Sequence, residues 1–577
     1  MTRTYGRLAA AGGQWAISAE PHVIIRIKRI FPRMVQGRTG TLFLKDTPEV
    51  ARDLEWLTER WPLELDAQSA SRLRSQASQH RDTEVAVGEI LVGQRALSLG
   101  FRQPARPPRP YQQQAADLIL ATGRLLLADD VGLGKTFSSL LVLRNPDALP
   151  ALVVTLTHLP QQWVDEVRKS LPWLNCLIIP TSKPKNSGYQ LGRPGGPLPD
   201  VLIMGYPKLA GWSDHLAGRV NTVIFDEIQE LRRGRDALKG VAAAMVADKA
   251  KYKVGLSATP VYNYAGEIHN ILEVLAPDAL GSRNEFLREW EGQTLGGGRN
   301  YKVADPAALG TYLRDQNLLL RRTRKDVHLV LPDPIEIEQP VDTDHASIEQ
   351  VAADVSHTAR IILGQEEATR EERWRAASDV DWRMRQATGV AKAAYVAEFV
   401  KLLLESEQKV VLFGWHREVY GIWLSKLGNY LPVMYTGSES PREKQLAAEA
   451  FRHGESRVLI MSLRSGAGLD GLQEACSAAV FGELDWSPEV HRQCVGRLAR
   501  DGQESTVVAY YMVSDDGTDP LMAEVLGVKK QQAEPIRDPN VALFEPLSTS
   551  TDRARALAAA VLSKASRHVG GQEAKSA

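Results

Sequence analysis

Cysteine is scarce in this sequence. The 577 residues include only Cys176, Cys476 and Cys494, and no two of them form a Cys-x-x-Cys pair. Three cysteines are too few for a disulfide framework, and without paired spacing they do not indicate a structural zinc site. This composition suits a reducing compartment, so we expect the protein to lie in the cytoplasm.

Long apolar runs and a net charge are also missing. No run approaches the roughly 18 apolar residues that span a bilayer, so we expect a protein that is neither secreted nor embedded in a membrane. Lys plus Arg equals Asp plus Glu at 70 each, so a site for a polyanion must come from local segregation of charge. Aromatic residues make up only 7%, but 44% of the residues are apolar, which excludes wholesale disorder.

The chain is too long for one hydrophobic core, since single cores stop growing near roughly 250 to 300 residues. Short runs rich in Val, Ile and Leu alternate with helix-like stretches, which is typical of parallel sheets with crossover helices. The runs are 124–130, 151–156, 201–206, 222–227 and 253–259, and then 409–415, 433–435, 457–463, 478–484 and 506–513. The pattern predicts an α/β protein with two doubly wound lobes.

We expect five regions along the chain. They are an N-terminal accessory domain (1–100), lobe 1 (101–264), helical insertions and an interlobe region (265–390), lobe 2 (391–532) and a C-terminal tail (533–577). The accessory domain is a small α+β unit with strands at 23–27 and 42–44 and a helix that Thr47 and Pro48 begin. Residues 102–108 are predicted to be a stiff linker, 366–385 a solvated helical spur, and 553–562 an Ala-rich helix.

A glycine-containing turn follows the first run of lobe 1. It reads Asp129-Asp130-Val131-Gly132-Leu133-Gly134-Lys135-Thr136. Free N–H groups and the helix dipole attract an anion at such a strand-to-helix turn. Lys135 can reach the β and γ phosphates of a nucleotide, and the Thr136 hydroxyl can ligate Mg²⁺. Because Asp129 replaces the usual first glycine, the turn taken alone fits an ordinary strand-to-helix connection equally well.

Two adjacent carboxylates, Asp226 and Glu227, end another apolar run. They are therefore placed at the carboxyl edge of a parallel sheet, where such sheets bind ligands. Asp226 would hold Mg²⁺ through water, and Glu227 would polarise the water that attacks the γ-phosphate. A pair that merely caps the strand end is the alternative.

Arg497 and Arg500 are three residues apart on a predicted helix of lobe 2, which places them on one face. They could stabilise charge on the transferred phosphate, an effect worth on the order of 10³ to 10⁵ in rate. Because the phosphate turn belongs to lobe 1, hydrolysis would require the lobes to close. Solvated arginines on a surface helix are the alternative.

In this combination and order, the motifs resemble those of the Swi/Snf-related helicase-superfamily ATPases, DNA translocases that include chromatin remodellers and bacterial RapA-like proteins. The resemblance covers about residues 107–532, and its most family-specific part is 320–332. It implies that both lobes are RecA-like. The segment 465–473 departs from the pattern, because Asp470 stands where Asn is usual and Gly471 is added.

What the resemblance implies about the nucleotide site can be stated residue by residue. Arg109, Tyr111 and Gln112 match the adenine-recognition motif, and Asp226 to Gln229 match the acidic box. The implied nucleotide contacts are Arg109, Tyr111, Gln112, Asp130, Gly132, Leu133, Gly134, Lys135, Thr136, Gln229, Gly468, Asp470 and Gln493. The expected catalytic residues are Lys135, Asp226, Glu227, Arg497 and Arg500, with ATP and Mg²⁺ as cofactors and with Thr136 and Asp226 as metal ligands.

The resemblance also implies a motor that grips duplex DNA by its phosphates. The candidate contacts are Arg321, Arg322, Arg324, Lys325, Thr157, Tyr206 and Ser465. For the four basic residues, a solvated helix face or bracing between the lobes is the alternative. Since the protein is formally neutral, DNA binding should be modest and steeply weakened by salt.

We therefore predict a DNA-dependent ATPase that moves along double-stranded DNA as a monomer, associated with the nucleoid. A strand-separating DNA or RNA helicase is the same-class alternative, and a scaffold that binds DNA without hydrolysis is the other. A protein loading partner or RNA polymerase would be a further partner. The N-terminal region, with its basic segment 26–33, resembles the DNA-recognition module of annealing-helicase relatives, and a partner-binding domain is the alternative.

Overall fold

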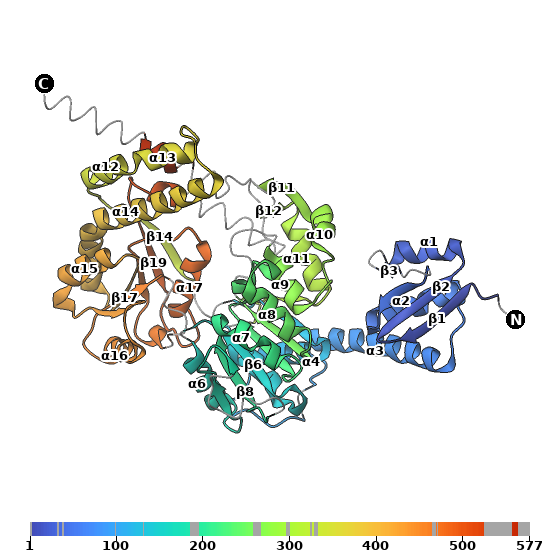
Figure 1. Cartoon of the computed structure of the whole chain (residues 1–577). Helices are drawn as coiled ribbons and strands as arrows, with labels where there is room; N and C mark the ends of the chain where they lie inside the picture. The colour runs from blue at the N-terminus through green and yellow to red at the C-terminus, as the bar shows by residue number, and fades with distance from the viewer. Residues whose placement is uncertain are drawn as a thin grey trace. The chain divides into compact units, whose positions relative to one another are not determined.

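The computed structural model describes residues 3–31, 34–36, 40–97, 100–130, 132–157, 159–184, 196–257, 267–295, 300–323, 326–327, 333–463, 469, 471–523, 555 and 557–562. The chain divides into two compact units (Figure 1). Unit 1 comprises Met1–Phe101 and Ala116–Gly123, and unit 2 comprises Arg102–Ala115 and Arg124–Ala577. The helix α4 (Pro110–Thr122) contributes residues to both units.

Unit 1 is built on a four-stranded antiparallel sheet in the order β1-β2-β4-β3. Its elements are β1 (Gly6–Ala11), β2 (Gln14–Ala19), α1 (Pro21–Ile30), β3 (Val35–Gln36), β4 (Leu42–Lys45), α2 (Pro48–Arg60) and α3 (Ala67–Leu91). Trp15 and Ile17 of the sheet are fully buried in one core with Leu54 and Leu57 of α2. The prediction of an α+β fold for this region is confirmed.

Local details of unit 1 both agree and disagree with the sequence interpretation. The Thr47 side chain accepts a hydrogen bond from the backbone N–H of Val50, as the predicted cap requires. The strand predicted at 23–27 is wrong, because these residues form the middle of α1. Val23 and Ile27 lie four apart on one helical face and are fully buried, whereas Ile25 is exposed. Burial at helical spacing therefore outweighs the β-propensity of this Val/Ile-rich run.

Lobe 1, the first part of unit 2, has an all-parallel seven-stranded sheet in the order β13-β5-β10-β9-β6-β8-β7. Its strands are β5 (Arg124–Leu127), β6 (Ala151–Thr155), β7 (Cys176–Ile178), β8 (Val201–Gly205), β9 (Thr222–Asp226), β10 (Tyr252–Leu256) and β13 (Leu319–Leu320). Its helices are α5 (Lys135–Leu140), α6 (Pro160–Ser170), α7 (Tyr206–Leu216), α8 (Leu238–Ala247), α9 (Glu267–Leu275), α10 (Arg283–Trp290) and α11 (Pro306–Asp315), and β11 (Glu291–Leu295) pairs with β12 (Asn300–Val303). The central strands β6 and β8 are buried at every position, which confirms the predicted buried parallel sheet.

Lobe 2 has a six-stranded parallel sheet in the order β14-β19-β18-β15-β17-β16. The strands are β14 (Ile335–Pro340), β15 (Val410–Gly414), β16 (Val433–Tyr435), β17 (Val458–Ser462), β18 (Ala478–Phe481) and β19 (Val508–Val513). The helices are α12 (His345–Asp354), α13 (Ser356–Leu363), α14 (Arg370–Ser406), α15 (Arg417–Lys426), α16 (Pro441–Arg452) and α17 (Pro488–Leu498). The two doubly wound lobes predicted from the sequence are thus both present.

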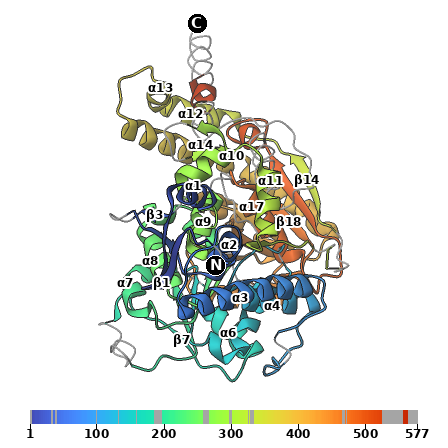
Figure 2. The same ribbon diagram turned by 90° about the vertical axis from the view of Figure 1, so that its right-hand side faces the viewer.

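The stretch 265–390 is less uniformly helical than predicted, since its described residues form four strands. One of them, β14, pairs with β19 and forms the edge of the lobe 2 sheet. The predicted spur 366–385 falls largely within α14, beside α12 and α13 in both views (Figures 1 and 2). It is not fully solvated, because Val380 and Met384 are buried in a core with Leu557 and Val561. Residues 557–562 are helical, as predicted for the C-terminal segment.

The proline-rich segment 102–108 contacts residues of lobe 1. The backbone N–H of Ala105 donates to Ser170 O at 2.8 Å, and Arg106 pairs with Glu166. The guanidinium of Arg102 lies over the Trp173 ring at 4.3 Å. The expected stiff linker is therefore attached along lobe 1, where α4 begins.

Candidate active site

The predicted phosphate turn connects β5 to α5. Gly132 and Gly134 both have left-handed backbones, with φ of 86° and 74°, a conformation that glycine adopts without a steric penalty. Lys135 begins α5, and its Nζ folds back to donate to the carbonyls of Asp129 at 2.8 Å and Asp130 at 3.2 Å. Burial lowers the pKa of Lys135, and the nearby carboxylates oppose that shift. The Lys135 amine thus lies against the backbone of its own turn.

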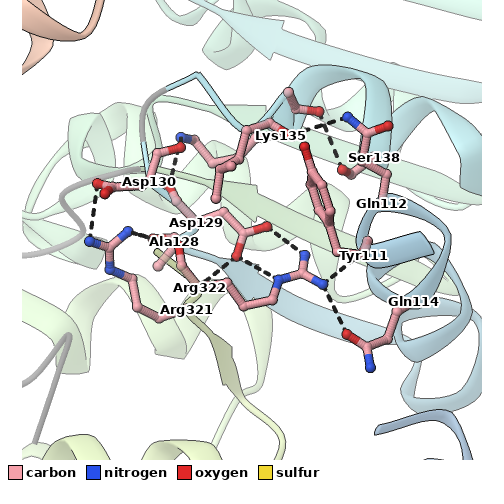
Figure 3. A network of polar contacts seen from close by, with 12 residues as sticks. Tyr111, Gln112, Gln114, Ala128, Asp129, Asp130, Lys135, Ser138, Arg321 and Arg322 are labelled. Carbon is pink, nitrogen blue, oxygen red and sulfur yellow. Dashed lines mark hydrogen bonds and ion pairs between the residues drawn. The ribbon is translucent and has the colours of Figure 1, made fainter. Parts of the chain in front are cut away.

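Gln112, from the predicted adenine-recognition motif, lies against this turn (Figure 3). Its Oε1 accepts from the backbone N–H of Arg109 at 3.0 Å, and its Nε2 donates to Leu133 O at 3.2 Å. A Cβ atom at Gly134 would lie 2.7 Å from Gln112 Nε2. The motif and the turn are therefore packed together, and glycine at position 134 is a steric requirement as well as a conformational one.

Asp129, which replaces the usual first glycine, is the anchor for Arg322 (Figure 3). Asp129 is fully buried. Arg322 donates to its Oδ1 from both the backbone N and Nε, each at 3.0 Å, and to its Oδ2 from Nη2. Arg322 Nη1 also donates to Tyr111 O at 2.6 Å and to Gln114 Oε1 at 3.0 Å. One arginine therefore joins the phosphate turn to the start of α4.

Arg321 makes a parallel pair with Asp130. Its Nη2 donates to Asp130 Oδ1 at 3.1 Å, and its Nη1 donates to Ala128 O at 3.1 Å. Burial acts to raise the pKa of Asp130, but the charge and hydrogen bond of Arg321 outweigh it and hold that pKa below its ordinary value. A solvated helix face was the alternative to DNA contact for these residues. For Arg321 and Arg322 that alternative is wrong, because they follow the short strand β13 and their side chains are 8% and 10% exposed. We therefore do not keep Arg321 and Arg322 among the proposed phosphate contacts.

The acidic pair ends β9, as predicted, and Glu227 has a left-handed backbone with φ of 51°. Asp226 Oδ2 accepts from Thr155 Oγ1 and from Trp163 Nε1, each at 2.8 Å. Burial raises the pKa of Asp226 despite these bonds. Burial together with the Asp226 charge raises the pKa of Glu227, although Gln229 donates a hydrogen bond to it. A carboxylate with a raised pKa is a stronger base, which suits Glu227 for polarising a water.

The predicted arginines of lobe 2 meet this site. The prediction that they share one helix face is wrong, because α17 ends at Leu498 and Arg500 follows it. Arg497 lies on α17, and its charge and that of Glu227 act on each other across the lobes. Its Nε is buried and, among the described residues, has no hydrogen-bond partner. A Cβ atom at Gly132 would lie only 3.0 Å from the Cβ of Arg500, so Arg500 packs directly on the phosphate turn. Arg109 of lobe 1 also forms an ion pair with Asp501.

The remaining predicted residues are placed as follows. Thr136 follows Lys135 on α5, Gln229 lies in the short turn after Glu227, and Gln493 is half-buried on α17. Thr157 and Tyr206 line one hollow of about 290 Å³ together with Lys239. Thr157 is exposed, whereas the Tyr206 hydroxyl is buried and donates to Asp226 O at 2.8 Å. Arg324, Lys325, Ser465, Gly468 and Asp470 lie outside the described residues.

Sequence reasoning missed three groups that shape this site. Asp129 was treated only as a departure from the glycine pattern, although a carboxylate in a buried turn signals a cationic partner. Thr155 is a polar residue at the end of an otherwise apolar strand, and Trp163 lies in the first turn of the helix that follows that strand. Both could have been identified as donors for a strand-end carboxylate.

The residues present can accommodate magnesium. Mg²⁺ is usually held by one or two carboxylates together with substrate phosphates and water, and Thr136 and Asp226 offer oxygen ligands of that kind. Within the described ranges, no three His, Cys, Asp or Glu side chains gather into a ready-made metal site. In the same part of the chain, no helix has the length and apolar character required to cross a bilayer.

Comparisons with known proteins agree with this arrangement. The model of the SNF2-related domain matches residues 54–375, and that of the helicase conserved C-terminal domain matches residues 391–502. The chain is 26% identical over 440 residues to the mouse (Mus musculus) DNA annealing helicase and endonuclease ZRANB3, covering 73% of this chain and 40% of that protein. It is 25% identical over 464 residues to the uncharacterized ATP-dependent helicase YqhH of Bacillus subtilis (strain 168), covering 71% of this chain and 76% of that protein.

A solved structure, the Sulfolobus solfataricus SWI2/SNF2 ATPase core in complex with double-stranded DNA, is also similar. It shares 20% identity with a TM-score of 0.36, and the match covers 76% of this chain and 95% of that one. The chain spans less than half the length of the mouse relative.

Proposed function

Since the chain belongs to the SNF2-related domain family, we propose that it is a DNA-dependent ATPase that moves along double-stranded DNA. ATP would bind on the lobe 1 turn that carries Lys135 and be hydrolysed against lobe 2. The observation that supports the proposal most is that Arg500 of lobe 2 packs on Gly132 of the lobe 1 turn. The charge of Arg497 also acts to lower the pKa of Glu227, which burial raises. The arginines of lobe 2 thus lie next to the phosphate turn of lobe 1.

In this proposal each residue has one task. Lys135 leaves the two carbonyls that it now contacts and binds the β and γ phosphates. Glu227 polarises the attacking water, and Arg497 and Arg500 neutralise charge that develops on the γ-phosphate. Mg²⁺, when bound near Thr136 and Asp226, would supply further neutralisation of the phosphate oxygens.

Base recognition is proposed for the segment that starts α4. The Gln112 side chain accepts from the Arg109 backbone N–H and donates to the Leu133 carbonyl of the phosphate turn. A purine that contacts Gln112 would therefore affect the position of Leu133. Tyr111 lies on the same segment, and its carbonyl accepts from Arg322. This connection favours adenine recognition that is linked to phosphate binding.

Duplex DNA is proposed to lie at the carboxyl edge of the sheets. The exposed Thr157 and the nearby Lys239, which pairs with Glu230 at 2.5 Å, lie at the same hollow. We propose Thr157 as a phosphate contact, and Arg324, Lys325 and Ser465 stay as proposed contacts from the family resemblance. A duplex substrate also favours a cytoplasmic, nucleoid-associated protein.

The test is ATP turnover measured with duplex DNA, single-stranded DNA and RNA at one fixed salt concentration. Duplex DNA should stimulate turnover most, and absence of stimulation by any duplex would overturn the proposal. Lys135→Ala and Glu227→Gln should abolish hydrolysis while thermal unfolding stays cooperative. Displacement of a triplex strand without duplex unwinding would identify a translocase, whereas duplex unwinding would identify a strand-separating helicase.

A further inference from the structure

The metal-side carboxylate, Asp226, is held by two side chains that have no other assigned role. Thr155 Oγ1 and Trp163 Nε1 both donate to the same oxygen, Oδ2, at 2.8 Å. Thr155 is fully buried and Trp163 is 3% exposed. Two buried donors on one oxygen fix the rotation of the carboxylate and leave Oδ1 as the oxygen that neither of them engages.

The backbone of the same turn is fixed as well. The buried Tyr206 hydroxyl donates to the Asp226 carbonyl at 2.8 Å. The next residue, Glu227, stays left-handed with φ of 51°, which is uncommon for a residue with a side chain and is kept only where the surroundings determine it. Side chain and backbone of Asp226 are therefore both positioned from outside β9.

All three donors come from connections at one edge of the lobe 1 sheet. Thr155 ends β6, Trp163 lies in the first turn of α6, and Tyr206 begins α7 directly after β8. The proposed phosphate contact Thr157 lies in the chain between Thr155 and Trp163. A ligand that moves this connection would therefore move both donors of the carboxylate.

We propose that Thr155 and Trp163 are positioning residues that orient Asp226 and make its orientation depend on DNA bound at the β6–α6 connection. This inference rests on the proposed function, because it describes how duplex DNA would stimulate hydrolysis. Outer hydrogen-bond partners of a metal-binding carboxylate typically contribute roughly 10- to 100-fold to metal affinity or activity. The bonds should therefore be measurable in metal binding as well as in turnover.

The test uses the full chain and matched variants. Thr155→Val keeps the side-chain volume but removes the donor, and Thr155→Ser restores a hydroxyl. Trp163→Phe removes the indole N–H. Its control is Trp212→Phe, because Trp212 is also a buried tryptophan of lobe 1 and its Nε1 donates to the backbone carbonyl of Thr181 at 2.9 Å.

Two quantities are measured, namely Mn²⁺ affinity in the presence of ADP, from the electron paramagnetic resonance signal of free Mn²⁺, and the ratio of turnover with and without duplex. Thr155→Val and Trp163→Phe should each weaken Mn²⁺ binding by roughly tenfold or more and lower the duplex stimulation ratio. Thr155→Ser and Trp212→Phe should keep both close to wild type. Melting temperatures of the two tryptophan variants separate a general loss of packing from a loss of positioning.

Two results would overturn the inference. One is wild-type Mn²⁺ affinity in both Thr155→Val and Trp163→Phe. The other is an equal loss in Trp212→Phe, which would assign the effect to packing alone. A wild-type protein that no duplex stimulates would instead refute the proposed function and the DNA coupling with it, while the Mn²⁺ measurement would still decide whether these donors position Asp226.

Discussion

Gly132 is where the two lobes meet at the phosphate turn, and its replacement by alanine tests that contact. The residue has φ of 86°, and an added Cβ would lie 3.0 Å from Arg500 Cβ and 3.3 Å from Arg500 Cα. A left-handed alanine costs about 1–2 kcal/mol in backbone strain. The contact adds a second effect, since Arg500 must retreat by several tenths of an ångström to reach an ordinary separation.

Gly218→Ala provides the matched control. Gly218 is also in lobe 1 with φ of 77°, but among the described residues other than its chain neighbours no atom lies within 4 Å of its added Cβ. Both variants should lower the melting temperature by a similar amount, roughly 2–8 °C for this strain in a domain of this size. Only Gly132→Ala should also impair catalysis, because misplacement by 1 Å can cost about 10²-fold in rate.

The assay is the turnover number at saturating ATP, together with the affinity for a fluorescent ATP analogue. Gly132→Ala should lose about tenfold or more in turnover and keep nucleotide affinity within a few fold of wild type. Equal turnover in Gly132→Ala and Gly218→Ala would refute the reasoning. So would a loss of affinity as large as the loss of turnover, because the turn itself would then be damaged.

Three further predictions concern other interactions. Asp501→Asn should raise KM for ATP by up to about fivefold at low salt and have little effect at high salt, since the half-exposed pair with Arg109 is worth about 0.2–1 kcal/mol. Lys392→Met leaves Asp519 buried without its partner at 2.6 Å and should cost about 3–5 kcal/mol in urea unfolding; a change below about 1 kcal/mol would contradict this. Burial raises the pKa of Cys176 to about 11, so its alkylation by iodoacetamide at pH 8 should be much slower in the native protein than in urea, and equal rates would exclude this environment. The pKa of this thiol is higher in the folded protein than in the unfolded chain. The protonated thiol therefore makes its full contribution to stability below about pH 8.5, and that contribution is lost as the pH rises toward 11.

Most strands of both lobes could be predicted because parallel strands are buried on both faces and consist of continuous apolar runs. The short strands β7 and β13 were not predicted. The strand β14 does not follow that rule. Its sequence alternates Ile335, Glu336, Ile337 and Glu338 at the edge of the sheet, within a charged stretch. The prediction of a strand where α1 forms was wrong, because Val23 and Ile27 have β-forming side chains but are buried at helical spacing.

The order of the site motifs could be predicted, whereas the partners of individual side chains could not. Arg322 and Asp129 are 193 residues apart, and only the pairing of β13 with β5 brings them together. The basic segment therefore looked like a DNA-binding surface, although two of its arginines lie inside lobe 1. The assignment of Lys135 and Glu227 to ATP chemistry stays a prediction for the experiments above.

The position of Arg321 and Arg322 along the chain has a mechanical consequence. They follow β13, the last strand of lobe 1, and β14 of lobe 2 begins at Ile335. Where the chain leaves lobe 1 toward lobe 2, ion pairs therefore join Arg321 to Asp130 and Arg322 to Asp129. A force that pulls the polypeptide away from lobe 1 after Thr323 would act on the turn through these two side chains and through the backbone bond from the Asp130 N–H to the Arg322 carbonyl. In the proposed motor, these bonds would connect movement of the lobes to the turn that we propose binds phosphate.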